Sequence, residues 1–376
     1  MANKIALTIA LLGALGVTSV AAQSNDEMIS KAVLPLPESL RAEAGVFTYA
    51  ADTGERQVLR QGSNAVECKT KDANGHTWCY PMSSASRRDF SAKLAAGGLE
   101  GDELRAAEAA AEAAGDIEPV TPGSMIYRLD DTEGRIQLLW VVMLPNTTSA
   151  DLGISSSGRF TSSVKGMGTP WMMREGTPSA HLMIPINGTD LSSGDGADAP
   201  LDPSEIHRFI RATLPLPRDL RREATVISYD KESGERSTLR KGTNTLVCLP
   251  SDSETGFTRC SHEDNLAEMD LRNKLAAEGK SSEEVNAAVV AAIEAGTIQL
   301  RTFGGLAYRF YEGDDRLKLL WVLRLPGVVS AETGMPIQAE REGLKVGKGT
   351  PWLMGEGTPR AHLMIPINGT ELSNFY

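Results

Sequence analysis

The sequence predicts an α+β protein of two tandem homologous domains, each an antiparallel-rich sheet with a helical insert and one disulfide. Three observations predict this class. The 376-residue chain repeats itself once, each copy has strand-like segments on both sides of helix-like ones, and each copy carries two cysteines at matching positions. The length alone is compatible with two to three domains.

The duplication is visible by direct comparison. Leu34-Pro-Leu-Pro37 recurs at residues 214–217, and the 28 residues from Gly166 to Ser193 match Gly347 to Asn374 at all but six positions. A period of about 180 residues is far too long for a solenoid or a propeller blade. Each copy is therefore expected to be a domain of about 170 residues with its own hydrophobic core.

The N-terminus has the pattern of an export signal. Lys4 precedes an apolar stretch, and Val20-Ala21-Ala22 is a small-residue cleavage site. An uncleaved anchor is the alternative, but the polar residues after Ala22 favour cleavage there. No second apolar stretch of 18 residues exists, so no stable membrane insertion is expected after cleavage. The predicted organisation is a signal peptide (1–22), a first repeat domain (23–191), a Pro/Gly-rich linker (192–204) and a second repeat domain (205–376).

The expected elements of each copy follow from periodicity and turn residues. In the second copy, alternating apolar residues and a Ser-Gly turn predict a β-hairpin, and two segments with helical periodicity end at glycines. Two apolar strands follow, and a third ends the copy. The expected hairpin covers 224–240, the helices 265–278 and 281–296, and the strands 306–311, 317–325 and 361–367; in the first copy a helix is expected over 102–114.

Four cysteines allow three pairings. The duplication selects Cys68–Cys79 and Cys248–Cys260, because each copy should carry the same bridge. Export makes disulfides chemically reasonable. Zinc bound by four thiolates is the alternative, but the close Cys-x-x-Cys pairs of such sites are absent.

Composition and charge exclude some functions. With 41% hydrophobic and 23% charged residues the chain is ordinary for a folded protein, and its net charge is −11. So acidic a chain has no surplus of cations to neutralise phosphate backbones, which argues against nucleic-acid binding. The expected partner is an unidentified small molecule or protein, and the two copies are candidates to pack as a pseudo-two-fold pair.

The strongest candidates for chemistry are two equivalent acid–histidine pairs, Glu175/His181 and Glu356/His362, in the repeated Gly-Thr-Pro-x-Ala-His segment. In a catalytic interpretation the histidine is a general base or metal ligand, and the glutamate orients it or is a second ligand. In a structural interpretation the histidine donates to a backbone carbonyl and the glutamate lies in the preceding turn. The structural interpretation is preferred, since duplication alone would keep both residues.

Two matched tryptophans, Trp171 and Trp352, follow turn residues and are expected to be partly exposed, which makes them candidates for stacking on a ligand. Trp140 and Trp321 lie inside apolar segments and are expected in the core. Neither Gly-x-Ser-x-Gly nor His-Glu-x-x-His occurs, so no nucleophile or zinc site is predicted. No cofactor is indicated.

The segments Leu59 to Asn64 and Gly176 to Pro185, with their counterparts 239–244 and 357–366, form the pattern Leu-Arg-x-Gly-[Ser/Thr]-Asn, then Cys, then Gly-Thr-Pro-x-Ala-His-x-Met-Ile-Pro. This pattern resembles that of uncharacterised exported bacterial proteins with one such domain each, whereas this chain carries it twice. The resemblance implies a bacterial, periplasmic or secreted setting and no particular activity. The sequence therefore favours an exported, non-enzymatic binding or scaffolding protein. The alternative is a hydrolase or metal-dependent enzyme that uses the acid–histidine pairs.

Overall fold

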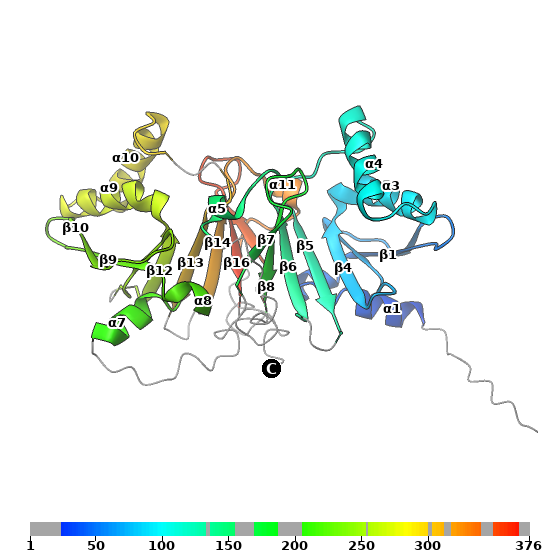
Figure 1. The fold of residues 1–376 in the computed structure, drawn as a ribbon, viewed down its shortest axis with the longest axis horizontal. Coiled ribbons are helices and arrows are strands. Elements are labelled where there is room, and N and C mark those ends of the chain that lie inside the picture. Colours follow the sequence, from blue (N-terminus) through cyan, green and yellow to red (C-terminus); the bar gives the residue numbers. More distant parts are fainter. Residues whose placement is uncertain are drawn as a thin grey trace, which may run out of the picture.

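A computed structural model describes residues 24–132, 136–154, 169–186, 205–252, 255–299, 303–311, 317–339 and 349–367. The predicted signal peptide and linker lie outside these residues. The predicted α+β class is confirmed: two similar halves each contain an eight-stranded sheet (Figure 1).

The two sheets have the same topology. Their strand orders are β2-β1-β3-β4-β5-β6-β8-β7 and β10-β9-β11-β12-β13-β14-β16-β15. Neighbouring strands are antiparallel except β1 with β3 and β9 with β11, which are parallel. The strands of the first half are β1 (Gly45–Tyr49), β2 (Arg56–Arg60), β3 (Val66–Lys69), β4 (His76–Pro81), β5 (Met125–Asp130), β6 (Leu138–Met143), β7 (Trp171–Met173) and β8 (His181–Pro185). Those of the second half are β9 (Thr225–Tyr229), β10 (Arg236–Arg240), β11 (Leu246–Leu249), β12 (Phe257–His262), β13 (Leu306–Tyr311), β14 (Leu319–Arg324), β15 (Trp352–Met354) and β16 (His362–Pro366).

The helices also repeat. In the first half they are α1 (Asn25–Ala32), α2 (Glu38–Arg41), the 3-10 turn η1 (Met82–Ser84), α3 (Ala85–Ala96), α4 (Gly101–Ala114) and α5 (Ser149–Leu152). In the second half they are α7 (Glu205–Ala212), α8 (Arg218–Arg221), η2 (Glu263–Asn265), α9 (Leu266–Ala277), α10 (Ser282–Glu294) and α11 (Ser330–Thr333). The two helices predicted for the second copy are thus confirmed as α9 and α10. The latter begins at a capping box in which Ser281 and Glu284 each accept a backbone N–H of the other. No helix in the described part of the chain is long and apolar enough to cross a membrane.

Both predicted disulfides are present, and each joins directly opposed residues of neighbouring strands. Cys68 pairs with Cys79 between β3 and β4, and Cys248 pairs with Cys260 between β11 and β12. All four sulfur atoms are buried. The bridges therefore fix the same strand pair in both halves, as the duplication predicted.

One hydrophobic core runs through both halves. Alternation along the strands turns one set of residues to an inner face, where Trp140 and Trp321 are fully buried as predicted. Tyr127 and Tyr308 pack edge-on against these two rings, with ring centroids 5.5 Å apart in each pair. The structure differs from the expectation of a separate core for each copy, because the inner-face residues of both sheets belong to the same buried cluster.

The two halves contact each other in a reciprocal way. A Cβ added at Gly153, after α5, would lie 2.4 Å from the ring of His262, and one added at Gly334, after α11, would lie 3.1 Å from Cβ of Ala65. Gly153 and Gly334 are equivalent in the duplication, and each faces the same region of the opposite half. Such reciprocity is the signature of an isologous contact, here made within one chain.

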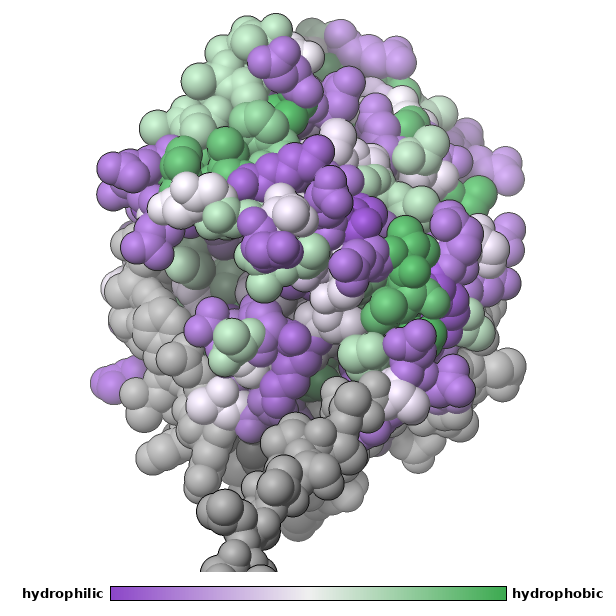
Figure 2. All heavy atoms as spheres, turned by 90° about the vertical axis from the view of Figure 1, so that its right-hand side faces the viewer, coloured by the Kyte–Doolittle hydropathy of each residue, from purple (hydrophilic) through white to green (hydrophobic). Residues whose placement is uncertain are grey.

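The outer faces of the two sheets are less uniform. Each carries a small apolar cluster at the edge formed by its last three strands, β6, β8 and β7 or β14, β16 and β15. Each is also partly covered by a helical pair, α3 and α4 in the first half and α9 and α10 in the second (Figure 1). Seen from the end of the first half, the surface mixes polar side chains with small apolar patches, and pale apolar residues gather at the top, where the alanine-rich α4 lies (Figure 2). The two outer faces differ most in their charges.

Candidate functional site: a cationic groove on the second half

The two predicted acid–histidine pairs do not form hydrogen-bonded pairs. Glu175 accepts from the backbone N–H of Ser149 at 2.8 Å and from its hydroxyl at 2.6 Å, so it caps the start of α5. These two bonds hold the pKa of Glu175 below its usual value. Glu356 accepts from the backbone N–H of Ser330 in the same way at 2.8 Å.

The histidines bond to the backbone instead. His181 and His362 each donate from Nδ1 to the carbonyl two residues earlier, at 2.8 Å in both halves, which is the contact that the structural interpretation expects. Burial lowers the pKa of both rings, and in His362 the charges of nearby arginines lower it further. Because Nδ1 carries the proton, Nε2 of the neutral His362 ring is an acceptor, and the ring lines the groove described below.

The two candidate stacking tryptophans are buried, so the expectation of partial exposure is wrong. Trp171 is 4% exposed and Trp352 is 7% exposed. They lie in the outer-face apolar clusters beside Met183 and Met364, because the short edge strands β7 and β15 turn them onto the sheet. Neither ring offers a free face to a ligand in this conformation.

No group of three or more histidine, cysteine, aspartate or glutamate side chains in the described part of the chain could hold a metal ion.

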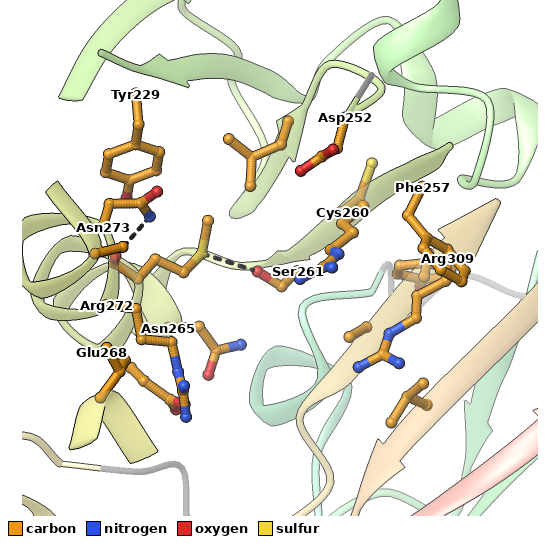
Figure 3. A pocket seen from close by; sticks show the side chains of 18 of the residues that line it. Tyr229, Asp252, Phe257, Cys260, Ser261, Asn265, Glu268, Arg272, Asn273 and Arg309 are labelled. Atoms are coloured by element: carbon orange, nitrogen blue, oxygen red, sulfur yellow. Dashed lines mark hydrogen bonds and ion pairs between the residues drawn. The ribbon is translucent and has the colours of Figure 1, made fainter. Parts of the chain in front are cut away.

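A large groove lies between α9 and the outer face of the second sheet. Its volume is about 970 Å³, within the size range of ligand sites. One side is a stripe at helical spacing along α9 and its N-cap residue, namely Asn265, Glu268, Met269, Arg272, Asn273 and Ala276. The floor comes from β12, β13 and β14, and Figure 3 shows side chains from the helix and the strands directed into the same space. Seven lysine and arginine side chains line the groove but only two carboxylates, in a protein of net charge −11.

Glu268 lies at one end of the groove among three arginines. Its carboxylate accepts from Arg272 Nε at 2.9 Å, and guanidinium nitrogens of Arg360 and Arg324 lie 3.3 and 3.5 Å away. Burial raises the pKa of Glu268, but the bond from Arg272 and the three positive charges outweigh it and hold the pKa below its usual value. One carboxylate faces three cations, so this end of the groove keeps an excess of positive charge.

A second cationic group lies further along the sheet. Arg259 of β12 and Arg309 of β13 are directly opposed across the strand pair, and each makes no hydrogen bond or ion pair with a described residue. Burial of the half-buried Arg309, together with the charge of Arg259, lowers its pKa. Like charges directly opposite each other destabilise a sheet. Arg259 is exposed and lies over the ring of Phe257, 6.0 Å from its centroid, so solvent screens part of the repulsion between the two charges.

The first half shows the same strand pair with its charge neutralised. At the positions of Arg259 and Arg309 it carries Trp78 and Arg128, and Arg128 has a carboxylate partner in Asp130, at 3.8 Å. Asp130 also bonds to Nε2 of His76, at 3.1 Å. In the second half Tyr311 replaces Asp130, so the carboxylate is lost where a second arginine is gained.

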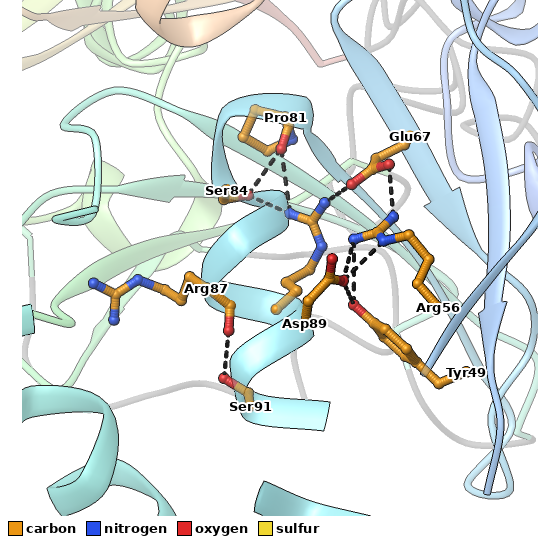
Figure 4. A network of polar contacts seen from close by, with 9 residues as sticks. Tyr49, Arg56, Glu67, Pro81, Ser84, Arg87, Asp89 and Ser91 are labelled. Atoms are coloured by element: carbon orange, nitrogen blue, oxygen red, sulfur yellow. Dashed lines mark hydrogen bonds and ion pairs between the residues drawn. The ribbon is translucent and has the colours of Figure 1, made fainter. Parts of the chain in front are cut away.

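The first half also pairs its buried charges internally elsewhere. Glu67 lies between Arg56 and Arg88, and Arg56 bonds in turn to Asp89 and to the Tyr49 hydroxyl (Figure 4). In the second half, Val247 and Met269 replace Glu67 and Arg88. The two outer faces have thus diverged, and unpaired positive charge is found on the second.

Sequence reasoning missed this groove, although a signal for it was present. Aligning the two copies shows that the second has gained arginines at four positions where the first carries Trp78, Ser91, Met143 and Ser179. These positions are scattered over 102 residues, and only the sheet register brings Arg259, Arg272, Arg324 and Arg360 to one groove.

Comparison with known proteins adds little. No protein-family model and no curated protein matches the chain. Among solved structures, the RsbU and RsbW domains of Rv1364c from Mycobacterium tuberculosis align over 86% of this chain and 91% of that chain. The identity is 13% and the TM-score is 0.17, too low to bear on fold or function.

Proposed function

We propose that this protein is an exported, non-enzymatic binding protein whose second half binds an oxyanionic ligand in the cationic groove. The observation that carries the proposal is the opposed pair Arg259 and Arg309, which lies in a large groove without a carboxylate partner among the described residues. Guanidinium groups present several fixed N–H donors and match carboxylate or phosphate oxygens well. A bound oxyanion would relieve the repulsion between the two arginines.

The first half then has a scaffolding role. Its outer face is neutralised by internal ion pairs, while its inner face completes the core that both halves share. The N-terminal segment with the pattern of an export signal supports a periplasmic or extracellular location, as do the two disulfides, which form in oxidising compartments.

The enzymatic alternative receives less support. It needs an acid beside the histidine, but Glu356 is bonded to Ser330 and makes no contact with His362 among the described residues. In this half the alternative rests on His362 alone.

The proposal is tested by calorimetric titration of the mature protein with inorganic phosphate, at low salt and pH 7. We expect binding that Arg309→Gln weakens about tenfold or more, since a hydrogen bond to a charged group contributes about 1.5–3 kcal/mol. Arg128→Gln is the matched control, because it makes the same change at the equivalent position whose guanidinium already has a partner. Absence of binding in the wild type, or equal loss in both variants, would refute the proposal.

A further inference from the structure

The groove has two cationic ends rather than one. Arg259 and Arg309 form one end, and Arg324 with Arg360 beside His362 forms the other. Arg324 is opposite Gly305, four residues from Arg309 along β13. At about 3.3 Å per residue, the backbone positions of Arg309 and Gly305 are about 13 Å apart along the strand. The distance between the charged groups at the two ends can be shorter, because arginine side chains are long.

The floor between these ends is uncharged and made of small residues. Ser261, Ala307 and Val322 lie opposite one another on β12, β13 and β14 and face the groove. Their counterparts in the first half are Tyr80, Ile126 and Val141, so two larger side chains occupy the equivalent space there.

Tyr80 fills its position in the first half well. Its ring stacks on Trp78 with centroids 6.2 Å apart, and the guanidinium of Arg88 lies 4.5 Å from its centroid. In the second half the Ser261 hydroxyl contacts Met269 Sδ at 3.7 Å, so Met269 takes part of the space that Tyr80 fills in the first half, whereas Ala307 is smaller than Ile126. The same face has also lost the carboxylate equivalent to Asp130. The space over Ala307 between two positive ends indicates a ligand that extends across it.

We infer that the cationic groove accommodates an extended ligand with two oxyanionic groups joined by a neutral spacer, of the kind represented by a linear dicarboxylate. One group lies at Arg259 and Arg309, the other at Arg324 and Arg360, and the spacer passes over Ala307 beside Met269. This inference rests on the proposed function and deepens it by naming the class of ligand. An uncharged spacer suits the floor, because a third anionic group there would find no cation.

The test compares two acids of the same chain length, suberate with a carboxylate at each end and octanoate with one. Titration of the mature protein is expected to give binding of suberate at least tenfold tighter than of octanoate. Arg360→Gln is expected to reduce this ratio towards one, since it removes the charge at one end while leaving Arg259 and Arg309 in place.

A second variant tests the spacer path without changing any charge. Ala307→Ile introduces the residue found at the equivalent position of the first half and is expected to weaken suberate binding at least tenfold. Its effect on phosphate, a compact ion that needs only one end, is expected to be less than threefold. Circular dichroism and the urea midpoint confirm that both variants are folded.

The outcomes separate the two proposals. Equal affinities for suberate and octanoate, with phosphate still bound and still sensitive to Arg309→Gln, would overturn the two-group ligand and leave the oxyanion site standing. Absence of binding for all three probes would overturn both. A suberate preference that survives Arg360→Gln would also overturn the assignment of the second end.

Discussion

Replacement of Glu268 by glutamine is expected to lower stability and strengthen anion binding at the same time. The amide keeps the size of the side chain and one acceptor oxygen for Arg272, but it removes the only negative charge that faces three arginines in this cluster of described residues. The fold loses its internal counterion, and the groove gains one unit of positive charge.

The magnitude follows from the geometry. At separations near 3.3 Å and an effective dielectric constant of about 20, each contact contributes about 5 kcal/mol of Coulomb attraction before the cost of desolvation is subtracted. Breaking a fully buried ion pair costs about 3–5 kcal/mol. The glutamate side chain is only 9% exposed, but the arginines are 20–36% exposed, and solvent screens them. We therefore expect Glu268→Gln to cost about 2–3 kcal/mol.

The assay is equilibrium unfolding in urea at pH 7, with Glu278→Gln as control. Glu278 is exposed at the end of the same helix, so its replacement is expected to change stability by less than about 0.5 kcal/mol. Because the folded-state pKa of Glu268 lies below its usual value of 4.5, its contribution is present above that pH and is lost as the pH falls through the folded-state value. The gap between wild type and variant should therefore close in acid. Equal stabilities at pH 7, or a gap that does not depend on pH, would refute this reasoning.

Three further predictions follow from the described contacts. Gly153→Ala should lower the free energy of unfolding by at least about 1 kcal/mol more than Gly176→Ala. Both glycines have φ of +70°, but only at Gly153 does an added Cβ meet the opposite half. Equal losses of stability in the two variants would contradict this packing of the halves. Affinity for sulfate, whose charge does not change in mild acid, should rise as the pH falls through the folded-state pKa of His362, because protonation of the ring adds a positive charge to the groove; this rise should disappear in His362→Gln but persist in His181→Gln. The pKa of the His362 ring is depressed in the folded protein, so its neutral form stabilises the fold above about pH 6.5. This contribution is lost as the pH falls through the folded-state pKa. The free energy of unfolding without anion, measured in urea, should therefore decline over the same range.

Much of the fold could be predicted because its signals are local or repeated. The helix at α10 follows from a capping box and helical spacing, and the hairpin of β9 and β10 from alternation around a turn. The disulfide pairing required no structure, since duplication left one consistent choice. The backbone role of His181 and His362 was also accessible, because a histidine at the start of a terminal strand has a carbonyl within reach.

The burial of the two tryptophans and the shared core could not be predicted, because they depend on how strands distant in the sequence pack together. The turn before Trp171 and Trp352 resembles an exposed loop, yet the edge strands fold both rings onto the sheet. A separate core for each copy was a reasonable expectation from length, but reciprocal contacts between the two halves join the inner faces.

The sequence by itself determined the duplication, the fold class, the disulfides and the absence of familiar catalytic motifs, because each of these depends on local periodicity or on comparing the chain with itself. Only the tertiary structure decided where function is to be sought. Arg259 and Arg309 are 50 residues apart in the sequence, and the net charge of the chain, −11, gives no sign of a local cluster of positive charge. Strand register places them side by side, and only the tertiary structure shows that no carboxylate from the described part of the chain pairs with them. The physical reason is that the interaction between charges depends on their distance in space and not along the chain.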